Sequence, residues 1–359
     1  MEIIDLYDAA DATSVEDAVA VATRALDAVN APVDDDQDGA VPAEILEDER
    51  LIGVDPSVYR QVETAINAGK NHIMFYGPPG TGKTELARYV ADSICTDGYT
   101  LVTGSADWTS QDLIGGYQPI GAGEIAFIPG VLLRYFDRPL IIDELNRCDI
   151  DKVLGPLFTV LSKQSTTLPY RVDVKDPKSA QYQILGQYDA SVVEPDYAPT
   201  RDWRIIATIN TVDKASLYQM SYALSRRFAW VFVDVPSDRN AFVGRYLDER
   251  HQVKISSSDI LPLAAVWNAT TEVRPLGAAP FIDVINYCLT RDEEFDFEAV
   301  PAGDASEAYL DAFKVNVLPM LDGVLKDEMQ ALSTKIADIL KLNADETSAL
   351  ARQMLSIGL

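Results

Sequence analysis

An apolar run leads directly into a glycine-rich loop at residues 72–84, which read His-Ile-Met-Phe-Tyr-Gly-Pro-Pro-Gly-Thr-Gly-Lys-Thr. The loop fits the pattern G-x-x-x-x-G-K-[ST], and its eight positions are Gly77, Pro78, Pro79, Gly80, Thr81, Gly82, Lys83 and Thr84. Glycines let backbone N–H groups surround phosphates, the lysine neutralises them, and the threonine hydroxyl is a ligand for Mg²⁺. An amphipathic helix begins at Glu85, and its N-terminal dipole favours the same anion. Against the alternative of an incidental Gly/Pro turn, this context predicts a site for a nucleoside triphosphate.

Two carboxylates end another apolar run, at residues 138–144. Asp143 comes 60 residues after Lys83, and Glu144 follows it. That spacing suits a strand beside the loop, where Asp143 would hold Mg²⁺ through water and Glu144 would polarise the attacking water. The alternative is an ordinary acidic pair at the end of a strand.

A third apolar run, residues 204–210, ends in an amide. Asn210 is placed to orient water or to contact the γ-phosphate. Arg226 and Arg227 follow at the end of a short helical segment. Two interpretations of these arginines stay open: a solvated helix end that favours the helix dipole, or fingers that reach the phosphates of a neighbouring subunit.

Strands and helices alternate along the central part of the chain. We expect strands near 72–76, 99–103, 138–144, 204–210 and 229–235, separated by helical segments such as 56–68 and 84–94. This order predicts an α/β domain with a parallel sheet and helices on both faces. The expected domains are an acidic N-terminal helix and linker (1–45), a nucleotide-binding α/β domain (46–236) and an almost wholly helical region (237–359). An insertion at about 164–203 is expected to form an extended hairpin and surface loop facing a partner.

The composition restricts the partners. The chain has 359 residues, with 56 acidic and 30 basic side chains, and a net charge of −26. Such a charge repels nucleic acid, so direct nucleic-acid binding is not expected. The three cysteines and two histidines show no metal-ligand spacing, and no apolar run is long enough for a membrane span. We therefore expect no membrane association and a cytoplasmic location. The acidic, lysine-poor composition suits either a salt-rich cytoplasm or simple solubility.

Taken together, the motifs resemble the AAA+ superfamily and, within it, the MoxR/McrB-like branch, over about residues 50–330. Residues 77–84 are similar to Walker A, residues 140–144 to Walker B, and 143–147 (Asp-Glu-Leu-Asn-Arg) to an extension typical of this branch. Asn210 falls at the sensor 1 position and 226–228 at the arginine-finger segment. Residues 209–216 are similar to a segment of McrB GTPases, and 112–130 lie where this branch inserts a hairpin into its second helix.

The resemblance implies a P-loop core followed by an α-helical lid, Mg²⁺-dependent ATP hydrolysis and a homo-oligomeric ring, expected to be a hexamer. It also places Arg274 at the sensor 2 position and Ile52 and Gly53 beside the base. Its implied effector is an McrC-like nuclease or a metal-binding partner of the MoxR type, although only an acidic stretch of some 45 residues stands where McrB proteins carry a large recognition domain.

GTP remains an alternative nucleotide. The competing hypotheses are a motor that remodels a partner, a slow nucleotide-gated scaffold and, with less support, a small-molecule kinase.

Overall fold

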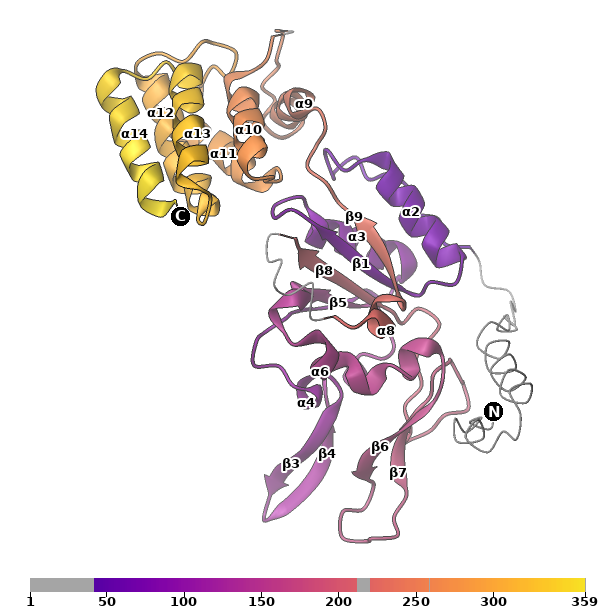
Figure 1. Ribbon diagram of the computed structural model, residues 1–359. Helices are drawn as coiled ribbons and strands as arrows, with labels where there is room; N and C mark the ends of the chain where they lie inside the picture. The colour runs from indigo at the N-terminus through magenta and orange to yellow at the C-terminus, as the bar shows by residue number, and fades with distance from the viewer. Residues whose placement is uncertain (1–41, 212–219, 258, 359) are drawn as a thin grey trace, which may run out of the picture. The chain divides into compact units, whose positions relative to one another are not determined.

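The computed structural model describes residues 42–211, 220–257 and 259–358 (Figure 1). The predicted acidic N-terminal helix, which the sequence places near 14–29, its linker and most of the McrB-like segment at 209–216 lie outside the described residues. The chain from Ala43 to Leu359 forms one compact unit.

A five-stranded parallel sheet forms the centre of the α/β region. Its strands are β1 (His72–Gly77), β2 (Thr100–Thr103), β5 (Leu140–Asp143), β8 (Ile205–Asn210) and β9 (Phe228–Phe232), in the order β2-β5-β8-β1-β9. The predicted parallel sheet is therefore confirmed. Because parallel strands end at the same edge, the carboxyl ends of β5, β8 and β1 lie next to one another.

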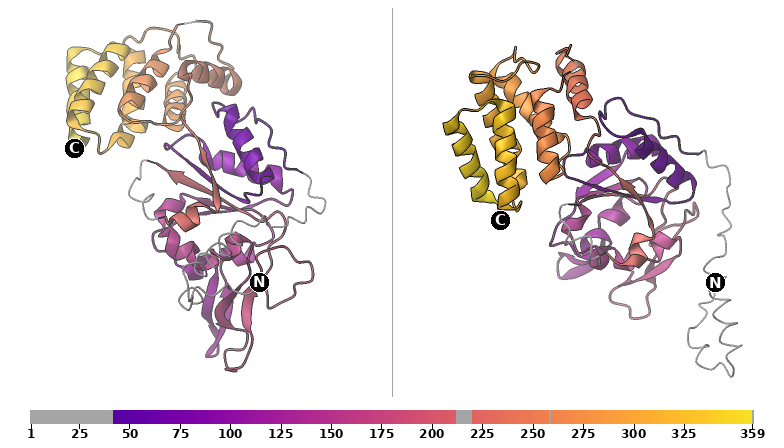
Figure 2. Two further views of the ribbon diagram at one scale, coloured as in Figure 1. Left: turned by 45° about the vertical axis from the view of Figure 1, so that its right-hand side comes forward. Right: turned by 45° about the horizontal axis from the view of Figure 1, so that its top comes forward.

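Helices cover both faces of this sheet, as expected (Figures 1 and 2). On one face, α2 (Pro56–Asn67) and α3 (Lys83–Ile94) pack against Ile73 and Phe75 of β1. On the other face lie α4 (Ser110–Leu113), α5 (Val131–Arg134), α6 (Ile150–Leu154), α8 (Tyr222–Ser225) and the 3₁₀ turns η2 (Leu145–Arg147), η3 (Gly155–Leu157) and η4 (Val160–Ser162). Strands buried on both sides explain why the sequence shows continuous apolar runs rather than alternation.

Two β-hairpins extend from the same side of the α/β region (Figure 1). The first pairs β3 (Gly115–Gly121) with β4 (Glu124–Pro129), and the second pairs β6 (Thr166–Arg171) with β7 (Gln181–Ile184). Both lie where the sequence predicts hairpins. The Tyr117 hydroxyl joins them, because it donates to the Arg171 carbonyl (3.1 Å) and accepts from the Arg171 N–H (2.5 Å).

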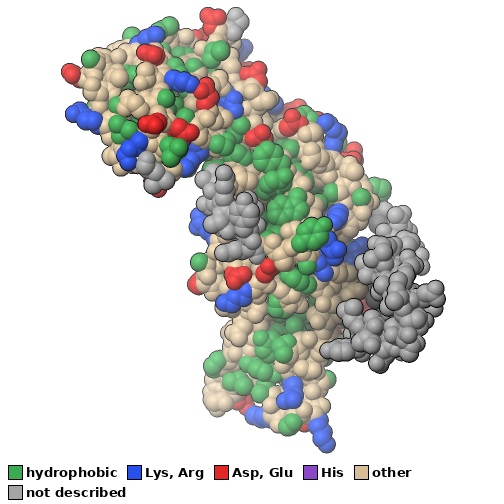
Figure 3. Space-filling view, viewed as in Figure 1, with side chains coloured by type: hydrophobic (Ala, Val, Ile, Leu, Met, Phe, Trp, Pro, Cys, Tyr) green, Lys and Arg blue, Asp and Glu red, His purple; other side chains and the backbone are tan. Residues whose placement is uncertain are grey.

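Aromatic rings fill the space between the hairpins, and Figure 3 shows apolar side chains on their exposed face. The ring contacts join Tyr117, Phe127, Tyr170, Tyr182 and Tyr197. The two hairpins therefore form one packed extension.

The rest of the described chain is helical. It consists of α9 (Arg239–His251), α10 (Pro262–Val273), α11 (Ala279–Arg291), α12 (Asp304–Asn316), η5 (Leu318–Leu321), α13 (Lys326–Leu340) and α14 (Ala344–Ile357). Its core includes Trp267 stacked on Phe281, with ring centroids 4.7 Å apart. Within this region the sequence predicts separate helices near 239–249, 259–269, 278–289, 307–318 and 326–341, but none that corresponds to α14. No described helix combines the length and the apolar character required to span a membrane.

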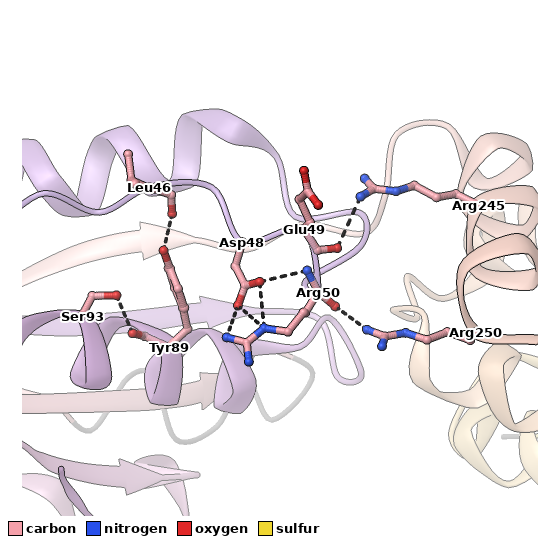
Figure 4. Close-up of polar contacts among 8 residues, drawn as sticks. All are labelled: Leu46, Asp48, Glu49, Arg50, Tyr89, Ser93, Arg245 and Arg250. Carbon is pink, nitrogen blue, oxygen red and sulfur yellow. Dashed lines mark hydrogen bonds and ion pairs between the residues drawn. The ribbon is translucent and has the colours of Figure 1, made fainter. Parts of the chain in front are cut away.

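Hydrogen bonds to backbone carbonyls link the helical region to the α/β region. On α9, Arg245 donates to the Glu49 carbonyl (3.3 Å) and Arg250 to the Arg50 carbonyl (3.0 Å), as Figure 4 shows. Beside these contacts, both carboxylate oxygens of Asp48 accept hydrogen bonds from the Arg50 guanidinium. These contacts attach the start of the helical region to the segment that precedes α2.

Candidate functional site

The loop after β1 has the backbone of an anion-binding turn. Gly77 adopts φ 153°, and a Cβ there would lie 2.1 Å from the Val233 carbonyl oxygen. Gly80 and Gly82 have φ values of 76° and 83°, which only glycine adopts readily. Gly82 caps α3 without a side-chain hydrogen bond, so no side-chain cap competes for the first N–H groups of that helix. These N–H groups are available to an anion, which fits a bound phosphate.

Lys83 brings a buried cation to the loop. Its side chain is 5% exposed, and Nζ donates to the carbonyls of Gly77 (3.1 Å) and Pro78 (2.6 Å). Burial lowers the pKa of Lys83 to about 8, and the carboxylates of Asp143 and Glu144 partly oppose this shift. An anion placed here would restore the missing counter-charge.

Asp143 and Thr84 meet at the carboxyl end of β5. The Thr84 hydroxyl donates to Asp143 Oδ1 at 2.7 Å, although 59 residues separate them. The Thr208 hydroxyl of β8 donates to the same oxygen at 2.6 Å. No cluster of three or more His, Cys, Asp or Glu side chains suited to a metal occurs among the described residues. One hydroxyl and one carboxylate fit Mg²⁺, which keeps several waters and binds substrate phosphates rather than an all-protein cage.

Glu144 follows Asp143 in the left-handed conformation, with φ 51°. Its Oε1 accepts from the Asn210 side-chain amide at 3.2 Å, and its Oε2 forms a close ion pair with Arg147. The structure thus brings together three places that are far apart in the sequence: Lys83, the Asp143–Glu144 pair and Asn210.

Ile52 and Gly53 line a separate cavity of about 610 Å³. Its walls come from residues 47–61 and 232–245, including Val233, the residue that contacts Gly77. The cavity therefore adjoins the start of the phosphate-binding loop. Glu85, by contrast, forms a 3.0 Å ion pair with Arg88 on the surface of α3.

Arg226 and Arg227 lie at the other end of the sheet. In the parallel pair β1–β9, His72 faces Phe228 and Tyr76 faces Phe232. The arginines precede β9, so a strand length of about 16 Å separates them from the loop at Gly77.

The two arginines also differ in their contacts. Arg227 donates to the Phe158 carbonyl (3.0 Å) and the Ser162 hydroxyl (2.8 Å), which ties it to its own chain. Arg226 is exposed and lies over the Tyr222 ring, 6.0 Å from its centroid.

Arg274 has a different contact from the one that the resemblance implies. Its guanidinium donates to the Met320 carbonyl at 3.0 Å, within the helical region. The backbone of the next residues approaches the loop instead: Gly277 N–H donates to the Pro79 carbonyl (2.8 Å) and Ala279 N–H to the Gly80 carbonyl (3.1 Å).

Four residues at the site are not predicted from the sequence: Arg147, Thr208, Gly277 and Ala279. Arg147 stands out in the sequence only as part of the Asp-Glu-Leu-Asn-Arg motif, and the glycine at 277 is the signal for a close backbone approach.

Comparison with known proteins agrees with this geometry. Residues 72–228 match the family described as AAA domain (dynein-related subfamily). Among curated proteins, the Holliday junction branch migration complex subunit RuvB of Phytoplasma mali is 33% identical over 72 residues, which cover 20% of this chain and 21% of that protein. RuvB of Desulfosudis oleivorans is 40% identical over 78 residues, covering 19% and 22%. The matched segments thus span only about a fifth of the length of these relatives.

Solved structures with similar chains include a RuvB mutant of Thermotoga maritima, with a TM-score of 0.44 and 15% identity over 86% of this chain and 88% of that one. Another is NtrX of Brucella abortus in complex with ADP, with a TM-score of 0.43 and 16% identity over 96% and 77%. The family match covers the segment that carries the motifs in their observed places. Residues 72–228 of this chain are thus similar to the AAA domain family, in its dynein-related subfamily.

Proposed function

We propose that this protein is a Mg²⁺-dependent nucleoside triphosphatase that works as a ring of identical subunits and remodels or activates a partner protein. The observation that carries the proposal is the meeting of the Thr84 hydroxyl, the Asp143 carboxylate and the Glu144–Asn210 pair beside the buried Lys83 amine. Lys83 and the α3 N-terminus would bind the phosphates. Thr84 and Asp143 would hold Mg²⁺, which when bound neutralises charge on the phosphates.

Glu144 is the residue positioned to take a proton from the attacking water. Its carboxylate lies one residue beyond Asp143, and the Asn210 amide holds one of its oxygens. Asn210 thereby orients the carboxylate and offers its remaining amide hydrogen to water or phosphate.

ATP is the proposed nucleotide. The support is the family match, because most AAA+ cores use adenine, and the absence from the sequence of the Asn-Lys-x-Asp signature of switch GTPases. GTP remains the alternative through the McrB-like segment at 209–216. Competition binding with ATP and GTP at one salt concentration decides between them, and a GTP preference above tenfold would reject ATP.

A neighbouring subunit completes the site in this proposal. Arg226 is exposed and about a strand length from its own loop, so it is available to another copy but not to its own phosphates. An arginine supplied in trans contributes about 10³–10⁵ in rate where this has been measured. Arg227 is a structural residue in this view, because Phe158 and Ser162 hold its guanidinium.

Mixing two inactive variants tests the shared site. Arg226→Ala and Lys83→Ala chains should each fail to hydrolyse ATP, whereas mixed assemblies contain interfaces with an intact loop and an intact arginine. Recovered hydrolysis is the expected result. Arg60→Ala, on the exposed face of α2, is the matched control and should hydrolyse normally. Normal hydrolysis by Arg226→Ala alone would reject the trans arrangement, and the lack of any hydrolysis by the wild-type protein would reject the hydrolase itself.

The Arg147–Glu144 ion pair favours a second candidate, a nucleotide-gated scaffold with slow turnover. A carboxylate oxygen that Arg147 already holds is not free to face the attacking water, so basal hydrolysis would be slow until a partner moves Arg147. Turnover measured with and without candidate effectors, an McrC-like nuclease or a MoxR-type metal-binding protein, separates the scaffold from the motor.

A further inference from the structure

Thr208 lies in the middle of β8, two residues before Asn210. The proposed hydrolysis mechanism assigns no role to its side chain. Its side chain is 2% exposed. A buried hydroxyl needs hydrogen-bond partners, and most side-chain hydrogen bonds in proteins go to backbone or water rather than to other side chains.

The partners of Thr208 are instead the two acidic residues of the site. Its hydroxyl accepts from the Glu144 backbone N–H at 2.9 Å and contacts Asp143 Oδ1 at 2.6 Å. Because the Glu144 N–H can only donate, the single hydroxyl hydrogen of Thr208 is free to point at Asp143. One side chain therefore fixes the carboxylate of one residue and the backbone of the next.

Thr84 adds a second hydroxyl donor to the same oxygen of Asp143, at 2.7 Å. Both donors use Oδ1, which leaves Oδ2 without a hydrogen-bond partner among the described residues. The orientation of the Asp143 carboxylate is thus fixed by two hydroxyls, from Thr84 in α3 and from Thr208 in β8. The Thr208 bond also holds the Glu144 peptide at φ 51°, a strained conformation for a residue with a side chain.

We propose that Thr208 is a positioning residue that couples the metal-holding carboxylate of Asp143 to the orientation of Glu144. This inference rests on the proposed function of the same site. Removing the hydroxyl should free the Asp143 carboxylate to rotate, which weakens Mg²⁺ binding, and should release the Glu144 turn, which slows hydrolysis. Outer-shell partners of metal ligands typically contribute 10–100-fold to metal affinity or activity.

Three substitutions test the proposal. Thr208→Val keeps the shape and removes the hydroxyl, and Thr208→Ser keeps the hydroxyl. Thr270→Val is the matched control: Thr270 is fully buried in α10, and its hydroxyl donates to the Val266 carbonyl of the same helix at 2.8 Å. All three are assayed for unfolding temperature, for kcat and KM, and for Mg²⁺ affinity.

Mg²⁺ affinity is measured without turnover, by titrating Mg²⁺ into each protein with a fluorescent non-hydrolysable ATP analogue. For Thr208→Val we expect a 10–100-fold weaker Mg²⁺ affinity and a similar loss of kcat, with analogue affinity in EDTA within about twofold of wild type. Thr208→Ser should return both values to within about threefold. Thr270→Val should lower only the unfolding temperature.

Wild-type Mg²⁺ affinity and kcat in Thr208→Val would overturn the proposal, as would equal losses in Thr208→Val and Thr270→Val. If the valine variant does not fold, Thr208→Ala replaces it in the same comparison with the serine variant. A wild-type protein that binds Mg²⁺ and the analogue without hydrolysing ATP contradicts the proposed function alone, because the Mg²⁺ titration still decides the role of Thr208.

Discussion

The buried amine of Lys83 should make nucleotide affinity depend on pH in a range where few side chains titrate. Burial lowers its pKa from 10.5 to about 8 in the nucleotide-free protein. Below pH 8 the amine is charged and binds phosphate directly. Above pH 8 binding must first return a proton to Lys83, so affinity for ATP should fall by up to tenfold for each further pH unit.

The contribution of Lys83 to protein stability should change with pH in the opposite direction to nucleotide affinity. In the unfolded chain Lys83 keeps its proton up to about pH 10.5, whereas the folded protein releases it near pH 8. The unfolded state therefore binds more protons between these values, and the Lys83 contribution to the free energy of unfolding rises with pH in that window. A difference of about 2.5 pKa units corresponds to about 3 kcal/mol at most.

The assay is equilibrium binding of a fluorescent ATP analogue from pH 7 to 9.5 without Mg²⁺, so that metal hydrolysis does not interfere. Lys83→Arg, whose guanidinium stays charged over this range, is the control and should bind with an affinity that hardly changes with pH. An affinity of the wild-type protein that stays constant up to pH 9.5 would show that the amine is not desolvated as the structure indicates.

Three further predictions concern the site and the hairpins. Glu144→Gln should keep nucleotide affinity and lose about 10²–10⁴ in hydrolysis rate, because an amide cannot take the proton from water; full turnover in a single-turnover assay would contradict this. Gly277→Ala should weaken nucleotide binding by about 5–100-fold, because its Cβ would lie 2.2 Å from the loop backbone. Gly155→Ala is its control, since no atom lies within 4 Å of that Cβ, and equal affinities would reject the contact. Tyr117→Phe should raise amide hydrogen exchange at Arg171 by about five- to tenfold, because about 1 kcal/mol of hydrogen bonding is lost; unchanged exchange would mean that the aromatic cluster alone joins the hairpins.

Much of the α/β fold was predictable because β1, β5 and β8 appear in the sequence as apolar runs with clear ends. Those ends, at Gly77, Asp143 and Asn210, meet at one edge of the sheet. Residue types and strand polarity were sufficient for this part. Helix α14 was overlooked although Asn343 and Glu346 form a capping box that marks its start.

Side-chain partners at the site were harder to predict because tertiary packing selects them. Thr208 is one more β-branched residue in an apolar strand, and only the neighbouring β5 turns its hydroxyl into a link between the Asp143 carboxylate and the Glu144 backbone. Arg274 lies close in sequence to residues that contact the loop, yet its side chain turns toward Met320. The different contacts of Arg226 and Arg227 likewise depend on tertiary structure, which brings Phe158 and Ser162 next to Arg227.

The parallel pairing of β1 and β9 has a consequence for assemblies of this protein. It places the loop and Arg226 at opposite ends of one strand pair, so copies that share a site as proposed would associate head to tail. An open row of n copies then contains n − 1 complete sites, and closure of the row into a ring adds the last one. Activity per subunit should therefore rise with the length of the row and rise again when the row closes. A gap between two subunits of a ring would inactivate one site without unfolding any chain.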